Sequence, residues 1–463
     1  MDSPGLRAPG IPIGPPRWEG IVAVGVLAVV VAAALGAYRE QVTTGLAVTG
    51  LNSPGYWGLY VVNFVFFIGL SAGGIIVASL VHAFGLREFR SIARIAELMA
   101  ISCLVLAMTF ILLDLGRPDR MLFLIRHWRI QSPLIWDVAV VHTYLVISLT
   151  YGYFGTRADL VRAAETFPRR RRLYHVLALG YLDLSPRALA RDDRILRVLA
   201  LVGLVGAIAL HTVTAWILGL VKARPGWYGA IMAPLFIVSA TVSGVALLLV
   251  SVVFCRRVLG LPIEARVIRS LGKLLALVIP VLGYFLFAEL LTVLYAKEPA
   301  ALRVFDEMMF GRYAPVFWGN LILGLMAPLA ILVVTLLDLS RRLVAAGAGT
   351  AVAIVMLAAA TGNLPVPRPV LGTIIVAGLL LALLRYVSPE TRIGAAAALV
   401  VLGVLAERWN IVVPPLIGFS HLPYPPGHYA PTGTELLLVA GVYAVGGILF
   451  AFAARILPLV ESE

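Results

Sequence analysis

Long apolar segments, each close to the length of a membrane-crossing helix, recur from near the start of the chain to its end. A helix needs about 20 mainly apolar residues to cross the hydrocarbon core of a bilayer. Hydrophobic residues make up 61% of the sequence, and short turns with polar, glycine or proline residues separate the segments. The alternating short segments typical of a membrane β-barrel do not occur. The sequence therefore predicts an all-α, polytopic integral membrane protein.

Twelve segments have the length and composition of a span, which sets an upper bound on the helix count. They lie at 20–38, 57–83, 94–114, 134–155, 197–220, 230–254, 271–296, 315–338, 346–362, 369–386, 393–409 and 434–456. The ninth to eleventh are short and are separated by tight turns that contain proline and arginine. In the alternative with ten spans, 346–386 is re-entrant or interfacial, so we expect 10–12 transmembrane helices.

Arginines gather in alternate loops, and this pattern orients the chain in the membrane. The loop at 156–196 contains nine arginines, and the loops near Arg90, Arg256 and Arg341 add to the same side. Loops rich in lysine and arginine face the cytoplasm, which predicts cytoplasmic termini as well. The net charge of +13 follows mainly from this topology. We expect the basic loops to face anionic lipid head groups and not nucleic acid, because no aromatic or fold signature of nucleic-acid binding accompanies them.

Cysteine and histidine residues are few, which limits the metal centres that the chain could hold. Cys103 and Cys255 have no CxxC partner, so neither a metal cage nor a disulfide framework is predicted. A b-type haem in a helix bundle needs two histidines that face each other at similar depth. His142 with His211 is the pair that could serve, and no second pair exists for stacked haems. A chain without haem or metal is favoured.

Four carboxylates are predicted to lie near the outer face of the membrane: Asp114, Asp137, Glu289 and Glu407. A charge within the hydrocarbon costs about 2.5–3.5 kcal/mol or more, so each carboxylate needs water, a partner or a function. Asp114 and Glu407 end their spans close to arginines, and boundary ion pairs would explain both. Asp137 and Glu289 reach further into the membrane, and for these two a function is favoured.

The fourth span carries three polar side chains at increasing depth. Asp137 and Tyr144 are seven residues apart and share one helix face. His142 is rotated away from that face and lies about 12 Å into the membrane. A carboxylate, a phenol and an imidazole in this arrangement can bind a polar ring and accept its protons. The alternative for His142, and for His211 in the fifth span, is a packing residue with a satisfied hydrogen bond.

Several short motifs, in this order, resemble those of the NrfD/PsrC-like family of polysulfide reductase membrane subunits. The layout is most similar to the quinol-binding membrane subunits of alternative complex III and of molybdoenzyme complexes. The matching stretches are Trp57–Tyr60, Gly69–Gly74, Asp114–Pro118, Ser132–Asp137, Tyr313–Trp318 and Ala406–Pro414.

The resemblance implies a fold of two four-helix bundles. The first bundle, with the quinone site, would occupy 57–222 and the second 223–342. An N-terminal segment with the first span, 1–56, would precede them. An added helical hairpin at 343–392 and the C-terminal spans at 393–463 would follow. The resemblance also implies the cytoplasmic membrane of a prokaryote.

The resemblance also implies a site near the outer face of the first bundle. Asp137 matches the acidic position associated with quinol deprotonation, and Asp114 stands where some relatives have histidine. We expect Asp137, His142 and Asp114 to handle protons. The candidate quinone-binding residues are Asn63, Arg117, Trp136 and Tyr144. The candidates for a proton route are Glu97, beside His82 in the inner half, and His211, Glu289 and Glu407.

The resulting hypothesis is a haem-free, quinone-reactive membrane subunit of a respiratory oxidoreductase complex, not active alone. Menaquinone or ubiquinone would be its bound substrate. A ferredoxin-like iron–sulfur subunit would dock on the outer loops at 115–133 and 410–433, with a molybdopterin-type or cytochrome c-type subunit beyond it. The alternatives are a secondary or proton-coupled transporter, which usually has broken helices at mid-membrane, and a purely structural membrane anchor.

Overall fold

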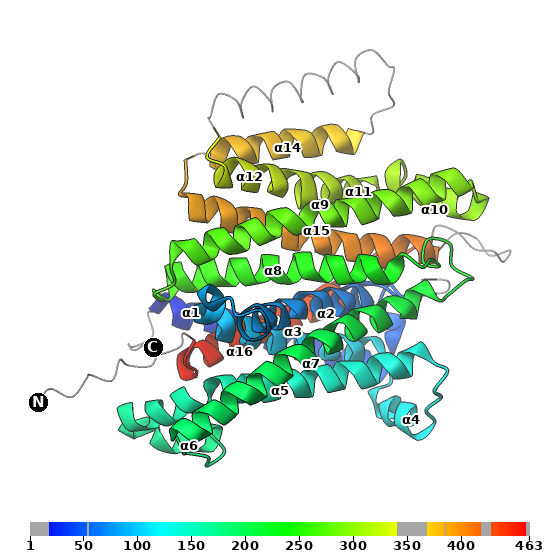
Figure 1. Cartoon of the computed structure of the whole chain (residues 1–463). Helices are drawn as coiled ribbons and strands as arrows, with labels where there is room; N and C mark the ends of the chain where they lie inside the picture. The colour runs from blue at the N-terminus through cyan, green and yellow to red at the C-terminus, as the bar shows by residue number, and fades with distance from the viewer. Residues whose placement is uncertain (1–17, 53–54, 340–367, 385, 418–426, 460–463) are drawn as a thin grey trace, which may run out of the picture.

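The computed structural model describes residues 18–52, 55–339, 368–384, 386–417 and 427–459, and all regular structure in these residues is helical (Figure 1). Within these described residues, ten helical segments are long and apolar enough to cross a membrane, which confirms the predicted all-α, polytopic membrane fold. They are α1 (Trp18–Thr44), α2 (Leu59–Ala78) with η2 (Ser79–Ala83), η3 (Arg87–Ile92) with α3 (Ala93–Asp114), α5 (Pro133–Thr166), α7 (Pro186–Gly219), α8 (Met232–Val258), α9 (Ala265–Ala296), α11 (Ala314–Trp318) with η6 (Gly319–Met326) and α12 (Ala327–Leu336), α15 (Pro389–Ile417) and α16 (Gly433–Ile456).

Shorter helices connect or flank these spans. They are η1 (Leu46–Val48), η4 (Pro118–Arg120), α4 (Met121–Arg126), η5 (Pro168–Arg170), α6 (Arg171–Leu177), α10 (Pro299–Met309) and α14 (Arg368–Leu384). The span predicted at 369–386 corresponds to α14, whose 17 residues extend for about 25 Å, less than the hydrocarbon core of about 30 Å. The span predicted at 346–362 lies outside the described residues.

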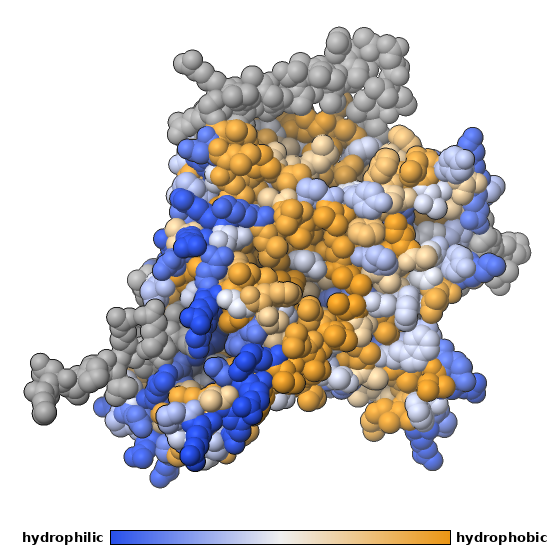
Figure 2. All heavy atoms as spheres, viewed as in Figure 1, coloured by the Kyte–Doolittle hydropathy of each residue, from blue (hydrophilic) through white to orange (hydrophobic). Residues whose placement is uncertain are grey.

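Helix α2 is the centre of the molecule and the most buried of the ten segments. It contacts α3, α7, α8 and α15, so it joins the helices before α8 to those after it. In Figure 1, α5 and α7 lie on one side of this centre, and α9, α12 and α14 lie on the other. An apolar surface separates hydrophilic patches at the two ends of the helices (Figure 2). The division into two four-helix bundles stays a prediction.

Helices α5 and α7 extend beyond the membrane at the arginine-rich end. Each has 34 residues and is about 51 Å long, well over the thickness of the hydrocarbon core. In the extended part, Arg157 of α5 is buried and pairs with Asp192 of α7 at 2.5 Å between Nη2 and Oδ2. This ion pair fixes the two helices together at their arginine-rich end, beside α6.

Gly73 of α2 and Gly244 of α8 lie at a close crossing of these two helices. A Cβ atom added to Gly244 would lie 2.4 Å from the backbone nitrogen of Gly73. Small residues at such crossings allow helix backbones to touch. Replacing Gly244 by Ala is therefore expected to destabilise the protein by about 1–3 kcal/mol, because the two helices must move apart.

This expectation is checked by thermal unfolding of the purified protein in detergent, with Gly283→Ala in α9 as the matched control. A Cβ atom at Gly283 would have no neighbour within 4 Å. Replacing this helical glycine by alanine is expected to leave the unfolding midpoint unchanged or raised. Equal midpoints for the two variants would show that the crossing of α2 and α8 is not under steric constraint.

Candidate functional site

Asp137 is a buried carboxylate close to the N-terminal end of α5, the end predicted to lie at the outer face. The helix begins at Pro133, whose fixed φ suits a first helical position and whose missing N–H costs nothing there. Asp137, on the next turn, is only 2% exposed. The hydroxyl of Thr214, on α7, donates a hydrogen bond of 2.6 Å to its Oδ1. No arginine, lysine or histidine pairs with Asp137 among the described residues, so this carboxylate is held by a neutral hydroxyl alone.

Two further polar groups face the packed surfaces of α5 and α7. Tyr144 lies two turns below Asp137 and is buried, as the predicted shared face requires. His211 lies about one turn below Thr214 on the same face of α7 and is also buried. Within the described part of the chain, the Tyr144 hydroxyl and the His211 Nε2 have no hydrogen-bond partner. Buried polar atoms in native proteins are normally paired, so both atoms are candidates to contact a ligand or water.

Trp136 lies at the rim of this site, and His142 lies outside it. The Trp136 indole donates to the carbonyl of Ile130 and packs edge-on against Trp216 of α7, with ring centroids 6.4 Å apart. His142 is exposed, and its Nδ1 lies 2.7 Å from the Val138 carbonyl of its own helix. The structure therefore does not bring His142 to Asp137. A haem held by His142 and His211 would need both imidazole rings to face one cavity. In this structure the His142 side chain is exposed, whereas His211 is buried.

Asp114, Arg117 and Asn63 interact with residues other than Asp137. Asp114 ends α3 close enough to Glu435 of α16 for the two carboxylates to interact. Arg117 is exposed and forms a bidentate ion pair with Asp119, both contacts being 3.0 Å. The guanidinium lowers the pKa of Asp119 below its ordinary value. Asn63 is buried on α2, where it donates to the Leu59 carbonyl and accepts a bond from Tyr443.

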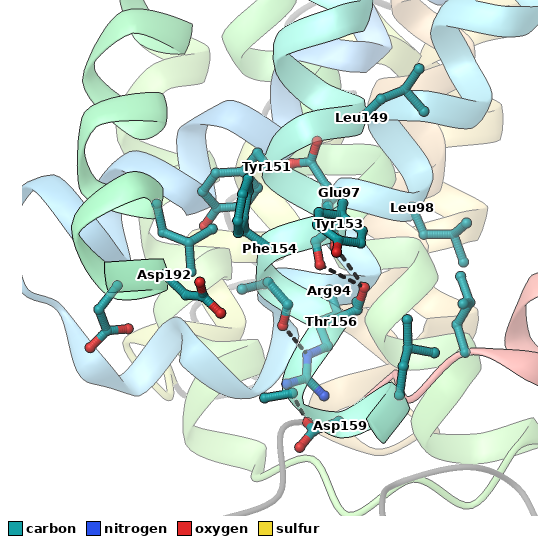
Figure 3. A pocket seen from close by; sticks show the side chains of 18 of the residues that line it. Arg94, Glu97, Leu98, Leu149, Tyr151, Tyr153, Phe154, Thr156, Asp159 and Asp192 are labelled. Carbon is teal, nitrogen blue, oxygen red and sulfur yellow. Dashed lines mark hydrogen bonds and ion pairs between the residues drawn. The ribbon is translucent and has the colours of Figure 1, made fainter. Parts of the chain in front are cut away.

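A cavity of about 590 Å³ opens near the arginine-rich end of α3, α5 and α7 (Figure 3). Its lining includes Glu97, whose Oε1 has no hydrogen-bond partner in the described structure. His82, in the π-helical turn η2, lies 2.8 Å from the Tyr151 hydroxyl and also lines the cavity. Arg94 pairs with Asp159 at its wall. The structure thus brings Glu97 and His82 together at the predicted cytoplasmic end.

Glu289 and Glu407 lie on the other side of α2. Glu407 of α15 is 2% exposed, so it is not the solvated boundary residue that its position suggested. It accepts a 2.7 Å hydrogen bond from Ser239 of α8, and its Oε1 lies 3.6 Å from the Nη1 of Arg408. Glu289 of α9 is near enough to interact with Glu407. The predicted pairing of Glu407 with Arg408 is therefore present, but inside the protein.

Sequence reasoning did not single out Thr214, Ser239 or Tyr443, which hold Asp137, Glu407 and Asn63. Serine and threonine are common in membrane helices, where they often hydrogen-bond to their own backbone. The presence of either residue therefore did not indicate a contact with a buried carboxylate. The adjacent charges of Glu407 and Arg408 within an apolar segment were the available sign of a buried pair. Among the described residues, no group of three histidine, cysteine, aspartate or glutamate side chains is placed to hold a metal ion.

Comparisons with known proteins agree on one family. The model of the family described as polysulphide reductase, NrfD, matches residues 47–361. A putative dimethyl sulfoxide reductase membrane subunit of Halobacterium salinarum is 31% identical over 95% of this chain and 91% of its own length. A selenate reductase subunit of Mesobacillus selenatarsenatis is 28% identical over 91% and 90%. The Hdr-like menaquinol oxidoreductase integral membrane subunit of Archaeoglobus fulgidus is 28% identical over 64% and 67%.

Proposed function

The chain belongs to the polysulphide reductase NrfD family, and from this premise we propose that it is the quinone-reactive membrane subunit of a respiratory oxidoreductase complex. Its relatives are named as membrane subunits of reductases, and one is named for menaquinol. Menaquinone is accordingly the first substrate to test. The names favour this function over the transporter and the structural anchor.

The observation that carries the proposal is the buried Asp137, held by Thr214 without a cationic partner among the described residues. Burial of an unpaired carboxylate costs free energy that a purely structural role would not repay. A carboxylate in such surroundings readily changes its protonation state, which suits it to accept or supply a proton. Its place near the outer end of α5 is within reach of an electron acceptor bound outside the membrane.

The neighbouring groups suit a quinone ring. Oxidation of a quinol to a quinone breaks two O–H bonds and releases two electrons and two protons. In the proposal, Asp137 accepts the proton of one hydroxyl, the His211 ring accepts the proton of the other, and the two electrons pass to the partner protein. The Tyr144 hydroxyl and the His211 ring, both buried, would hydrogen-bond the ring oxygens. Quinone reduction uses the same groups in reverse.

The outer loop at 115–133 has the properties of a docking surface for an extrinsic subunit. Helix α4 exposes Leu122, Phe123 and Ile125, and Trp128 follows it. Exposed apolar side chains rimmed by arginines are typical of protein interfaces. In the proposal, an iron–sulfur subunit binds over α4 and takes electrons from the nearby quinone site. The predicted second loop, 410–433, contains residues 418–426, which lie outside the described structure.

The cavity near Glu97 is the proposed inner end of a proton route. Tyr144 lies close enough to Glu97 for an electrostatic interaction. Glu97 could therefore exchange protons between the cavity and the α5–α7 site. Because the cavity is at the arginine-rich end, this route would open toward the cytoplasm, with both chain termini on that side.

A photoreactive menaquinone analogue tests where the ring binds. Crosslinking in the purified complex, followed by peptide mapping, is expected to label α5 between Asp137 and Tyr144 or α7 between His211 and Trp216. Excess menaquinone should suppress this label. Competable labelling confined to α9 or α15 would contradict the proposed site. The absence of any competable label would contradict quinone binding by this chain.

A further inference from the structure

A second polar cluster lies between α8, α9 and α15, and it consists of the buried Ser239, Glu407 and Arg408 with the half-buried Glu289. Arg408 is only 1% exposed. Its Nη2 donates a 2.8 Å hydrogen bond to the Ser239 hydroxyl, and that hydroxyl donates to Glu407. The guanidinium also stacks over the ring of Phe236 at 4.6 Å. Ser239 therefore bridges the two charged residues and fixes their relative positions.

The cluster contains several buried polar atoms without hydrogen-bond partners in the described residues. These are the Nε and Nη1 of Arg408 and the Oε1 of Glu407. Unpaired atoms of this kind, close together, indicate a hydrated site, since buried water normally satisfies such groups. Water inside the cluster would allow protons to move between the carboxylates.

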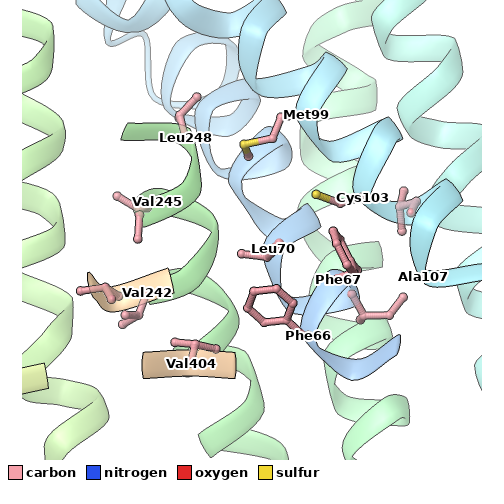
Figure 4. Packing of buried hydrophobic residues seen from close by; sticks show 14 of the residues in the cluster. Phe66, Phe67, Leu70, Met99, Cys103, Ala107, Val242, Val245, Leu248 and Val404 are labelled. Carbon is pink, nitrogen blue, oxygen red and sulfur yellow. The ribbon is translucent and has the colours of Figure 1, made fainter. Parts of the chain in front are cut away.

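Apolar side chains surround the cluster and keep its charges in a low-dielectric medium. Phe66, Leu70, Val242 and Val404 pack in the adjoining core (Figure 4). Gly69 of α2 approaches so closely that a Cβ atom there would lie 3.5 Å from the Arg408 Nη2. The spans α2, η6 and α12 also contact α15 and contain no charged side chain. Helix α10 also contacts α9 and α15, but its charged residues Arg303, Asp306 and Glu307 are exposed. The charges of Glu289, Glu407 and Arg408, with His211 facing from α7, must therefore balance among themselves.

Charge neutrality of Glu289, Glu407 and Arg408 requires one proton on a carboxylate. If Glu289 and Glu407 were both ionised, the two carboxylates and Arg408 would have a net charge of −1 inside the membrane. Two carboxylates that interact closely do not both ionise readily. Glu407 has the hydrogen bond from Ser239 and the guanidinium beside it, both of which favour its ionised form. In the described structure, Glu289 has no ion-pair partner.

We propose that Glu289 and Glu407 form a proton-binding site in which one exchangeable proton resides mainly on Glu289 while Glu407 neutralises Arg408. This site is separate from the Asp137 site and lies on the opposite side of α2. The proton balance does not depend on quinone chemistry.

The site is coupled to the α5–α7 site through His211, and this part rests on the proposed function. His211 interacts electrostatically with Arg408. A proton that arrives on His211 during quinol oxidation adds positive charge beside Arg408. The added charge favours ionisation of Glu289, so the cluster releases its proton. Such coupling is reciprocal, because each protonation changes the free energy of the other by the same amount.

Infrared difference spectroscopy of the purified complex during a pH change tests the proton-binding site. The wild type is expected to show a carbonyl band of a protonated carboxylic acid, and Glu289→Gln should abolish this band. Glu407→Gln should abolish it too, because Glu289 then ionises to balance Arg408. A band that persists in Glu407→Gln would mean that Glu289 is protonated by burial alone, and would overturn the proposal. A wild type without the band, or a band that persists in Glu289→Gln, would also overturn it.

Two further variants keep the test decisive. If Glu289→Gln does not assemble, Glu289→Asp retains the acid on a shorter side chain and should shift the frequency of the band. An unshifted band would overturn the assignment to Glu289. Asp137→Asn should leave the pH-induced band in place while it lowers quinone turnover. Normal turnover in that variant, with the band still lost in Glu289→Gln, would reject the quinone site and leave the proton-binding site intact.

Discussion

Replacing Asp137 by Asn is expected to lower quinone turnover by the assembled complex by a factor of about 10² or more. A positioned acid–base group typically contributes about 10²–10⁴-fold to a rate. The amide keeps the size of the side chain and can still bond to Thr214, but it cannot accept a proton from a quinol. Steady-state turnover with a water-soluble menaquinol analogue and an artificial electron acceptor measures the effect. The quinol concentration at half-maximal rate should change little.

Glu298→Gln is the matched control for this prediction. Glu298, between α9 and α10, is also a carboxylate next to a membrane span, but it is exposed and lies outside the proposed sites. Its replacement should leave turnover within about twofold of the wild type, because an exposed charge is solvated and contributes little. Equal losses in the two variants would mean that outer-face charge, and not proton transfer at Asp137, controls the rate.

Replacing Arg408 by Gln is expected to destabilise the protein by about 3–5 kcal/mol. Removing one partner of a buried ion pair leaves the other as an uncompensated charge in a low-dielectric interior. In this variant the uncompensated charge is that of the Glu407 carboxylate, because no other cation neutralises it among the described residues. Unfolding of the purified subunit in mixed detergent micelles, followed by circular dichroism, measures the free energy of unfolding.

The double variant Glu407→Gln with Arg408→Gln separates charge from packing. It removes both charges and should recover most of the lost stability. Arg126→Gln, at an exposed position on α4, should have no effect. A double variant as unstable as the single one would show that Arg408 acts through its packing on Phe236 and not through its charge.

The sequence predicted the membrane class and each of the ten spans found in the described residues, among them 393–409, one of the three short segments of the prediction. Both follow from length and hydrophobicity, which depend on local composition. The shared face of Asp137 and Tyr144 was also predictable, because helix periodicity fixes it. The side of the helix that faces the protein was harder to predict. His142 is exposed because it is rotated about the helix axis by more than a third of a turn from the buried face of Asp137 and Tyr144. The apolar residues of α5 occur on both faces, so they did not indicate which face packs against the protein.

The sequence did not predict which residues far apart along the chain would be joined by hydrogen bonds. Thr214 is 77 residues from Asp137, and Ser239 is 168 residues from Glu407. Nothing in the local composition around either residue indicates its partner. The prediction that Glu407 lies at a solvated boundary was natural for a charged residue late in its span. The structure extends α15 to Ile417 and buries the pair, because Asn410 and the following apolar residues continue the helix.

The most direct measurement of Asp137 as the proton acceptor is single-turnover electron transfer from menaquinol to the electron acceptor of the intact complex, followed by stopped flow. Wild type, Asp137→Asn and Asp137→Glu would be compared at saturating menaquinol. A large fall in the rate for Asp137→Asn, with substantial recovery for Asp137→Glu, is the predicted result. An Asp137→Asn complex that transfers electrons at the wild-type rate would contradict the assignment of Asp137 as the proton acceptor.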